Sequence, residues 1–364
     1  MKNVLHLCES SDTGGAESVL TSLVGGLDKN QYQSVVCLLS EGWLSSELRK
    51  RNIETLVIPQ PRSFDLAWML RLHRLIRGRD IHVMHSHEFA TNIYASMLSV
   101  ISGVPVIATV HGKNYYGDKW RRRVAYRFVA RQSLMVAVSN DLRSFLEKRV
   151  GIARGRIRVV HNGIDTSHFV RRQETRSGIA GLGIRNDQPV IGTVGNLFVV
   201  KGQIHLLRAC QLVAKAIPDF VLLIAGEGDQ RRMLETEAAA LGITNNVKFL
   251  GFRADVPALL QGMDIFVLPS LSEGLPLSVL EALALQKAVV ATDVGGVGEI
   301  LENEINGFIV PPCDPEALAN KILLLLRQPQ LAAKIGLAGR RTVETAFGLE
   351  KMVREYQTLY EEVS

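Results

Sequence analysis

Short apolar runs of strand length alternate along the chain with longer segments of helical periodicity. In the first half these runs, rich in Val, Ile and Leu, lie at 3–8, 34–39, 55–58, 82–85, 106–110, 134–138 and 157–160. In the second half they lie at 190–194, 220–225, 247–250, 265–268, 288–292 and 308–310. Alternation of this kind predicts an α/β protein whose strands form parallel sheets connected by crossover helices.

The chain is long enough for two domains, because 364 residues exceed the size at which one hydrophobic core keeps growing. Apolar periodicity is lost around 166–188, where Arg and Gly accumulate instead. We therefore expect a first Rossmann-like domain at 1–170, a linker at 171–187, a second domain at 188–346 and a final helix at 347–364. In open sheets of this type ligands bind beyond the carboxyl ends of the strands, so motifs that follow strands matter most.

Composition excludes several classes of protein. A hydrophobic content of 47% with 21% charged residues is that of a folded domain rather than a disordered chain. No apolar run reaches membrane-spanning length, and the first apolar run is too short for a signal peptide, so we expect a cytoplasmic protein. The scattered residues Cys8, Cys37, Cys210 and Cys313 suggest core thiols in a reducing compartment.

Charge is concentrated in the first half. Residues 1–170 hold 23 Lys and Arg against 14 Asp and Glu, whereas the remainder hold 19 against 22. Such an excess favours an anionic partner, either nucleic acid or anionic lipid. Within 114–132, the stretch 119–131 is basic with interleaved aromatic residues, which is typical of helices at an anionic membrane surface. A solvated basic helix packed on the sheet is the alternative; no nucleic-acid-binding signature accompanies the charge, so we expect no nucleic-acid partner.

The segment 265–285 combines three parts that together suit an anionic ligand. An apolar strand at 265–268 leads into a turn at 269–274, and Pro276 precedes a helix predicted from Leu277. The start of a helix presents unpaired N–H groups and partial positive charge to an anion. Glu273 and Glu281 could flank that anion and each accept hydroxyl hydrogen bonds, as a nucleotide diphosphate sugar requires. In the alternative, Glu273 lies in an ordinary surface turn and Glu281 on a solvated helix face.

Histidines and glycines follow strands of the first half. Gly14 and Gly15 form a turn after the first strand, where backbone can approach a ligand closely. His111 stands at the end of the strand 106–110, beside a glycine. His85 and His87 end another strand, but we expect no metal site there, because no further ligand is indicated and alternate strand residues are taken to face opposite sides. One of the two is expected to be a hydrogen-bonded residue of the binding site.

Lys201 follows the strand 190–194 and is predicted to open the next helix. A cation at a helix start is unfavourable unless an anion is held there, which makes Lys201 a candidate diphosphate ligand. The glycine turn at 295–296, after the strand 288–292, is predicted to offer further N–H groups to the same anion.

Glu273 and Glu281, with seven residues between them in a Pro-Ser-x-x-Glu-Gly-Leu-Pro context, resemble the signature of retaining glycosyltransferases of family 4. Matching context extends from Gly14 to Phe308. The resemblance implies the GT-B fold, in which two Rossmann-like domains face each other across a cleft and the last helix returns to the first domain. It also implies transfer of a hexose-type sugar, with retention, from a UDP- or GDP-sugar to a glycan or lipid-linked acceptor in cell-surface polysaccharide or lipopolysaccharide synthesis.

The resemblance assigns roles to single residues. It makes His111, Glu273 and Lys201 catalytic, and implies no metal ligand and no cofactor. The donor-binding residues that it implies are Gly15, Asn196, Lys201, Glu273, Gly274, Leu275, Pro276, Leu277 and Glu281. Asn196 departs from the family, which usually has Arg there, so a charge-assisted bidentate contact is lost. Either phosphate binding is weaker or another cation, such as Arg253, compensates.

Two other functions fit the same scaffold. One is a nucleotide-sugar epimerase or a phosphorylase. The other is a non-catalytic protein that binds a sugar nucleotide or a membrane surface, which the loss at Asn196 permits and the retention of Glu273, Glu281, Lys201 and His111 argues against. The absence of a G-x-G-x-x-G sequence counts against a dinucleotide-dependent oxidoreductase.

Overall fold

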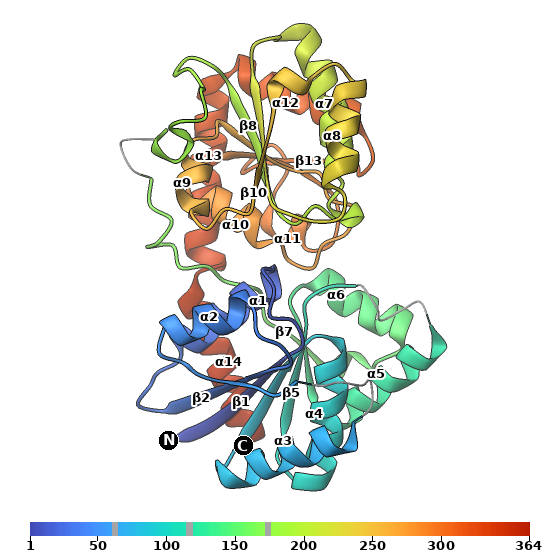
Figure 1. The fold of residues 1–364 in the computed structure, drawn as a ribbon. Helices are drawn as coiled ribbons and strands as arrows, with labels where there is room; N and C mark the ends of the chain where they lie inside the picture. Colours follow the sequence, from blue (N-terminus) through green and yellow to red (C-terminus); the bar gives the residue numbers. More distant parts are fainter. Residues whose placement is uncertain (60–64, 114–118, 172–175) are drawn as a thin grey trace. The chain divides into compact units, whose positions relative to one another are not determined.

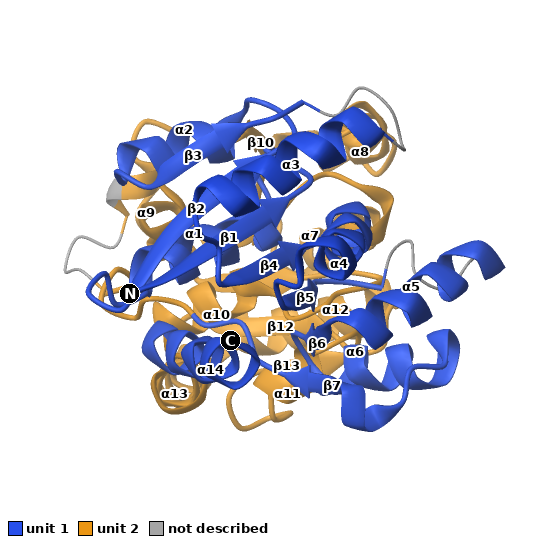
Figure 2. Cartoon of the chain, turned by 90° about the horizontal axis from the view of Figure 1, so that it is seen from below, with its two compact units in different colours: residues 1–163, 349–364 blue, residues 164–348 orange. Residues whose placement is uncertain are grey.

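The computed structural model describes residues 1–59, 65–113, 119–171 and 176–364 (Figure 1). The chain divides into two compact units (Figure 2). The first comprises Met1–Gly163 and Leu349–Ser364, and the second comprises Ile164–Gly348. The expected aromatic residues Tyr115 and Tyr116, and positions 172–175 of the expected linker, lie outside the described residues. The described positions of that linker, 171 and 176–187, lie in the second unit, which begins at Ile164.

The first unit is built on a seven-stranded parallel sheet in the order β3-β2-β1-β4-β5-β6-β7. Its strands are β1 (Lys2–Cys8), β2 (Tyr32–Leu38), β3 (Glu54–Val57), β4 (Val83–His87), β5 (Val106–Val110), β6 (Leu134–Ala137) and β7 (Ile157–Val159). Its helices are α1 (Gly15–Gly26), α2 (Trp43–Lys50), α3 (Leu66–Gly78), α4 (Phe89–Ser102), α5 (Trp120–Gln132), α6 (Asn140–Phe145) and α14 (Leu349–Val363). Short helical turns, η1 (Leu146–Val150) and η2 (Arg154–Arg156), precede β7.

Different chemistry covers the two faces of this sheet. One face packs an apolar core against α3 and α4, centred on side chains such as Trp68 and Leu98. The other face packs against α1, α2 and α14 and carries buried histidines as well as apolar groups. The last helix of the chain therefore completes the first unit (Figure 1). Gly26 of α1 allows its close approach, since a Cβ there would lie 2.8 Å from a methyl group of Val353.

The second unit is built on a six-stranded parallel sheet in the order β10-β9-β8-β11-β12-β13. Its strands are β8 (Val190–Val194), β9 (Val221–Ala225), β10 (Val247–Gly251), β11 (Ile265–Leu268), β12 (Ala288–Thr292) and β13 (Phe308–Val310). Its helices are α7 (Gln203–Ala216), α8 (Arg231–Ala240), α9 (Val256–Gln261), α10 (Leu277–Ala284), α11 (Val297–Ile300), α12 (Pro315–Arg327) and α13 (Pro329–Ala346). Short 3₁₀ turns are η3 (Ser177–Ile179), η4 (Val199–Lys201) and η5 (Thr244–Asn246).

The predicted α/β class with doubly wound parallel sheets is confirmed. Strand order reverses between β1 and β4 in the first unit and between β8 and β11 in the second. Such reversal points leave a crevice outside the carboxyl ends of the strands, and ligands of open α/β sheets bind there. The loops that follow β1, β4, β8 and β11 are therefore where a site is expected in each unit.

Candidate active site

In the second unit, the loops that follow β8 and β11 are fastened to each other. The backbone N–H of Leu271 donates to the carbonyl of Val200 at 2.7 Å. Gly202 adopts a left-handed conformation, with φ at +63°, and a Cβ at this position would stand 2.1 Å from the carbonyl oxygen of Pro269. Only a glycine fits such a close approach, so the two loops meet at a fixed distance.

Lys201 and Glu273 form an ion pair across these loops. The ammonium of Lys201 lies 2.7 Å from Oε1 of Glu273, and the hydroxyl of Ser270 donates to the same oxygen at 2.7 Å. The Glu273 side chain is only 7% exposed whereas that of Lys201 is 30% exposed. Glu273 thus depends on these two partners, while part of the ammonium faces outward.

The predicted local structure at Lys201 is wrong in one respect. Lys201 ends the 3₁₀ turn η4 and does not open α7, which starts at Gln203. The anion that balances its charge within the unit is the carboxylate of Glu273. Two residues that the sequence placed in separate roles are therefore in direct contact.

The turn after β12 closes over the loop after β11. Gly295, with φ at +59°, lies so close to Glu273 that a Cβ would stand 2.1 Å from its carbonyl oxygen. The N–H of Gly296 donates to the carbonyl of Gly274 at 2.7 Å, and that of Val297 donates to Val294. These amides are therefore already used, and the prediction that the turn at 295–296 offers its N–H groups to an anion is wrong at Gly296.

Helix α10 starts where the sequence predicted, at Leu277 after Pro276. Pro276 is the N-cap residue, and no side chain forms a capping hydrogen bond there. The first turn contains no acidic residue, so the partial positive charge of the helix start is not neutralised locally. Gly274, Leu275, Pro276 and Leu277 together lead the chain from the Glu273 loop into this helix start.

Glu281 lies one turn further into α10 and is half-buried. Removal of its carboxyl group from water raises its pKa to about 7. Among the described residues, no side chain or backbone group forms a hydrogen bond or ion pair with this carboxylate. A partly buried acceptor that the protein itself does not satisfy is suited to hydroxyl groups of a ligand.

Asn196, the residue that departs from the family pattern, contacts the first residue of α7. Its backbone carbonyl accepts a hydrogen bond from the side chain of Gln203 at 3.0 Å. The expected substitute cation, Arg253, forms two hydrogen bonds with Asp255, at 2.6 and 2.5 Å, and Asp255 raises its pKa. Arg253 is therefore held by an acidic neighbour in this structure, and Lys201 remains the cation on the loops described above.

In the first unit, the glycine turn lies between β1 and α1. Gly15 is the first residue of α1 and is exposed, and a Cβ built there would meet no atom within 4 Å. A Cβ at Gly14, in contrast, would lie 2.3 Å from Oε2 of Glu17. A side chain at Gly14 would therefore displace the Glu17 carboxylate, whereas the open space at Gly15 is compatible with a ligand.

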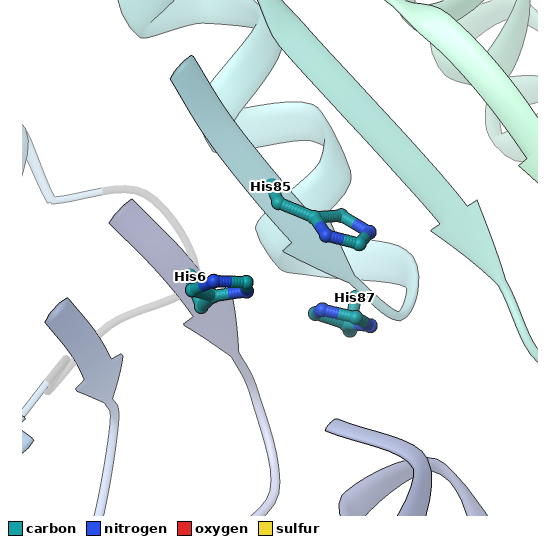
Figure 3. A group of neighbouring side chains, drawn as sticks. All are labelled: His6, His85 and His87. Carbon is teal, nitrogen blue, oxygen red and sulfur yellow. The ribbon is translucent and has the colours of Figure 1, made fainter. Parts of the chain in front are cut away.

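Buried histidines line the carboxyl ends of β1 and β4 (Figure 3). His6, His85 and His87 are fully buried, and the rings of His85 and His87 lie 4.2 Å apart. The expectation that these two point to opposite faces is wrong, because residues two positions apart in a strand share a face. The prediction that no further histidine accompanies them is also wrong. His6 lies beside them on the neighbouring strand β1, and Nδ1 of His87 lies 3.0 Å from Nε2 of His111.

Three neighbouring imidazoles are a donor set that zinc prefers, but His85 is already engaged at both nitrogens. Its Nδ1 lies 2.7 Å from the hydroxyl of Tyr360 and its Nε2 lies 2.8 Å from that of Thr109. A metal would have to break one of these bonds. One of the two histidines was expected to be hydrogen-bonded, and in fact both are. His85 contacts Tyr360 and Thr109, and His87 contacts His111.

Burial keeps these histidines uncharged. It lowers the pKa of His6 to about 3 and that of His111 to about 4, and it holds the pKa values of His85 and His87 well below the usual range. Each ring therefore has one N–H donor and one acceptor nitrogen at neutral pH.

Sequence reasoning missed a pair of acidic residues in the first unit. Glu88, directly after β4, has φ at +74° and ψ at 179°, a region that non-glycine residues rarely adopt. Its carboxylate accepts a hydrogen bond from the N–H of Ser10 at 3.1 Å. Burial, together with the charge of Glu17, raises the pKa of Glu88 to about 7. The only feature of the sequence that could have pointed to Glu88 was its position directly after His87, at the end of a strand.

Helix α5, which covers most of the basic stretch 119–131, presents basic and apolar side chains together. Tyr126, Val129 and Ala130 are buried against the unit, whereas Trp120 is 63% and Val124 is 53% exposed. The guanidinium of Arg121 lies over the ring of Trp120 at 5.6 Å. Within the described parts of the chain, no helix has both the length and the apolarity to cross a bilayer.

Comparison with known proteins supports a common origin of these features. A family model described as Glycosyltransferase Family 4 matches residues 13–168, and one described as Glycosyl transferases group 1 matches residues 176–342. Alpha-maltose-1-phosphate synthase of Mycolicibacterium smegmatis is 30% identical over 312 residues, which cover 78% of this chain and 79% of the relative. The chain therefore belongs to the group 1, family 4 glycosyltransferases.

Further matches agree with this family and with its fold. UDP-Gal:alpha-D-GlcNAc-diphosphoundecaprenol alpha-1,3-galactosyltransferase of Escherichia coli is 25% identical over 309 residues, covering 81% of this chain and 79% of the relative. The crystal structure of HepE from Anabaena in complex with UDP-glucose superposes with a TM-score of 0.90 at 24% identity, covering 99% of this chain and 100% of that chain. The fold is GT-B, and the protein is a glycosyltransferase.

The packing of Gly295 on Glu273 can be tested with a matched pair of variants. Gly295→Ala should lower the melting temperature more than Gly242→Ala, because both positions have a left-handed backbone but only Gly295 lacks room for a Cβ. The shared conformational cost is about 1–2 kcal/mol. Thermal unfolding followed by circular dichroism measures the difference. Equal losses would mean that the close approach to Glu273 imposes no constraint.

Proposed function

We propose that this glycosyltransferase moves a hexose-type sugar from a UDP- or GDP-sugar to a glycan or lipid-linked acceptor, with retention of configuration. The observation that carries the proposal is the half-buried carboxylate of Glu281, which has no partner among the described residues and lies one turn above an uncapped helix start. In a ligand that joins a vicinal diol to an anionic group, the diol would donate hydrogen bonds to the Glu281 carboxylate and the anion would bind at the helix start. The ribose and diphosphate of a nucleotide sugar have that chemistry.

In this proposal each group of the second unit has one role. Glu281 accepts hydrogen bonds from the ribose hydroxyls. The diphosphate lies at the start of α10, where main-chain N–H groups and the ammonium of Lys201 face it. Oε1 of Glu273 is occupied by Lys201 and Ser270, whereas Oε2 has no hydrogen bond among the described residues, so Oε2 is the atom proposed to hold sugar hydroxyls.

The reaction would break the bond between the anomeric carbon and the diphosphate and form a bond from that carbon to an acceptor oxygen. Negative charge develops on the leaving diphosphate, and Lys201 and the start of α10 would stabilise it. The proton of the acceptor hydroxyl would leave with the diphosphate. This scheme uses no metal ion and no covalent nucleophile, and His111 would contact the sugar being transferred.

The acceptor side is proposed from the relatives and from α5. The Escherichia coli relative is named for a diphosphoundecaprenol-linked acceptor, and such an acceptor resides in a membrane. We propose that α5 docks on the cytoplasmic face of an anionic membrane, with Trp120 inserted among lipid headgroups and the arginines near anionic phosphates. A role in cell-surface polysaccharide or lipopolysaccharide synthesis would follow from such an acceptor.

A direct assay tests the proposed donor and acceptor classes. Purified protein incubated with UDP- or GDP-hexoses and a mixture of lipid-linked sugars should release nucleoside diphosphate and elongate the lipid, and activity should persist in EDTA. Conversion of the donor without acceptor would instead indicate an epimerase.

Glu281→Ala should raise the donor KM about tenfold or more, because hydrogen bonds to a charged acceptor are lost. An unchanged KM would remove Glu281 from the ribose site.

The pKa of Glu281 gives the direction of a pH effect on donor binding. Its carboxyl group is ionised above about pH 7, and the ionised form accepts hydroxyl hydrogen bonds at both oxygens. Affinity for UDP should therefore rise from about pH 6 to about pH 8, and the Glu281→Gln variant should lack this component. Calorimetric titration at the two pH values, with both proteins, measures the difference.

The ion pair of Lys201 and Glu273 calls for a design that separates stability from catalysis. Lys201→Met should lower turnover about 10²–10³-fold through lost charge stabilisation, and it should also lower the melting temperature, because Glu273 keeps its charge in a nearly buried position. The double variant Lys201→Met/Glu273→Gln should regain stability but not activity. Lys215→Met, at an exposed position on α7, serves as the control. Full turnover in Lys201→Met would exclude Lys201 from the site.

Membrane docking through α5 predicts binding that depends on lipid charge. The chain should sediment with phosphatidylglycerol vesicles but not with phosphatidylcholine vesicles. The triple variant Trp120→Ser/Arg121→Gln/Arg123→Gln should no longer bind phosphatidylglycerol vesicles. A matched variant, Lys215→Gln/Lys334→Gln, removes two exposed charges from the second unit and should still bind. Equal loss in both variants would argue for non-specific charge attraction.

A further inference from the structure

The hydrogen bond between His87 and His111 carries an inference about the first unit. We propose that His87 is a positioning residue whose Nδ1–H donates to Nε2 of His111 and thereby keeps the His111 proton on Nδ1, ready to donate to an oxygen of the transferred sugar. This role rests on the proposed function, because it takes His111 as a contact of that sugar.

Two neutral rings can share this bond in only two ways. The nitrogens are 3.0 Å apart, and burial keeps both imidazoles uncharged. A neutral imidazole has one N–H and one bare nitrogen, so the direction of the bond fixes the tautomer of both rings. Either His87 donates and His111 carries its proton on Nδ1, or His111 donates and carries its proton on Nε2.

The unsatisfied nitrogens decide between these two patterns. Over the described residues, Nδ1 of His111 and Nε2 of His87 are both buried without a hydrogen-bond partner. Buried N–H groups without a partner are rarer than buried acceptors without one. If His111 donates, the orphan N–H lies on Nε2 of the fully buried His87, where a ligand has no access. If His87 donates, the orphan N–H lies on Nδ1 of His111, an atom that is covered here but belongs to a partly exposed residue, so a small movement of its surroundings would bring a sugar oxygen within reach.

An unpaired N–H in the free protein is then part of the binding site. A buried donor without a partner destabilises the free protein, and this penalty is removed when a sugar oxygen accepts its hydrogen bond. The chain therefore tolerates the orphan group in the free state and recovers the loss on binding.

The surroundings of His87 prevent its ring from turning away. Its ring is tilted by 34° against that of His85, with the ring centres 4.2 Å apart, and it meets the nearly parallel ring of His111 through the hydrogen bond, with the ring centres 5.3 Å apart (Figure 3 shows His85 and His87 with His6). His85 is itself fixed through hydroxyl groups on Tyr360 of α14 and Thr109 of β5. The orientation of His111 thus depends on a series of contacts that runs from His87 through His85 to Tyr360 on α14.

Two substitutions at His87 test the direction of the bond. His87→Asn keeps an N–H donor in the position of Nδ1, whereas His87→Asp offers only acceptors and reverses the bond. The ring nitrogens of His111, in protein with ¹⁵N-labelled histidine, report the tautomer by NMR without any substrate. We expect the proton on Nδ1 in the wild type and in His87→Asn, and on Nε2 in His87→Asp. His168→Asn, at an exposed position, is the control.

Activity measurements complete the test. With a UDP-hexose and a lipid-linked acceptor, His87→Asp should lose about tenfold in kcat/KM, the equivalent of one hydrogen bond, and His87→Asn should stay closer to the wild type. A proton on Nε2 of wild-type His111, or the same tautomer in both variants, would overturn the proposal. If the tautomers behave as expected but no sugar is transferred, the proposed function fails, and the role in sugar binding fails with it.

Discussion

Oε1 of Glu273 is the point on which the second unit's site depends. It receives the ammonium of Lys201 and the hydroxyl of Ser270, while the backbone of the same residue packs against Gly295. Loops that follow three different strands are thereby fixed around one nearly buried carboxylate. Because each of these contacts helps to offset the desolvation of that carboxylate, they favour this arrangement of the loops.

In the first unit the main constraint is different, because several imidazole rings are buried there and must stay uncharged. Removal from water disfavours the imidazolium form, and each neutral ring then needs its own donor and acceptor. Hydroxyl groups of Thr109 and Tyr360 meet this need for His85, while His87 and His111 share a single bond. The groups that stay unsatisfied lie toward the end of the sheet where strand order reverses, which is the place where an α/β sheet binds ligands.

Sequence patterns predicted the fold closely, because parallel strands buried on both faces give continuous apolar runs and their ends are marked by glycine and proline. The strand Val190–Val194 and the helix start at Leu277 were predicted at the residues where they occur. Contacts between distant segments were not predictable in this way. The pairing of Lys201 with Glu273 spans seventy-two positions, and that of His85 with Tyr360 spans 275. Neither local propensity nor spacing encodes such contacts, and the place of Glu88 at a strand end did not indicate its strained backbone.

The return of α14 makes the first unit discontinuous in sequence, with the whole second unit inserted between Gly163 and Leu349. Synthesis on the ribosome proceeds from the N-terminus, so the second unit can fold from one uninterrupted stretch as soon as it emerges. The sheet of the first unit must wait for α14 to cover its histidine-bearing face. Until then His85 lacks the Tyr360 hydroxyl, and a sheet made early stays incomplete until a helix translated after the whole second unit is added to it.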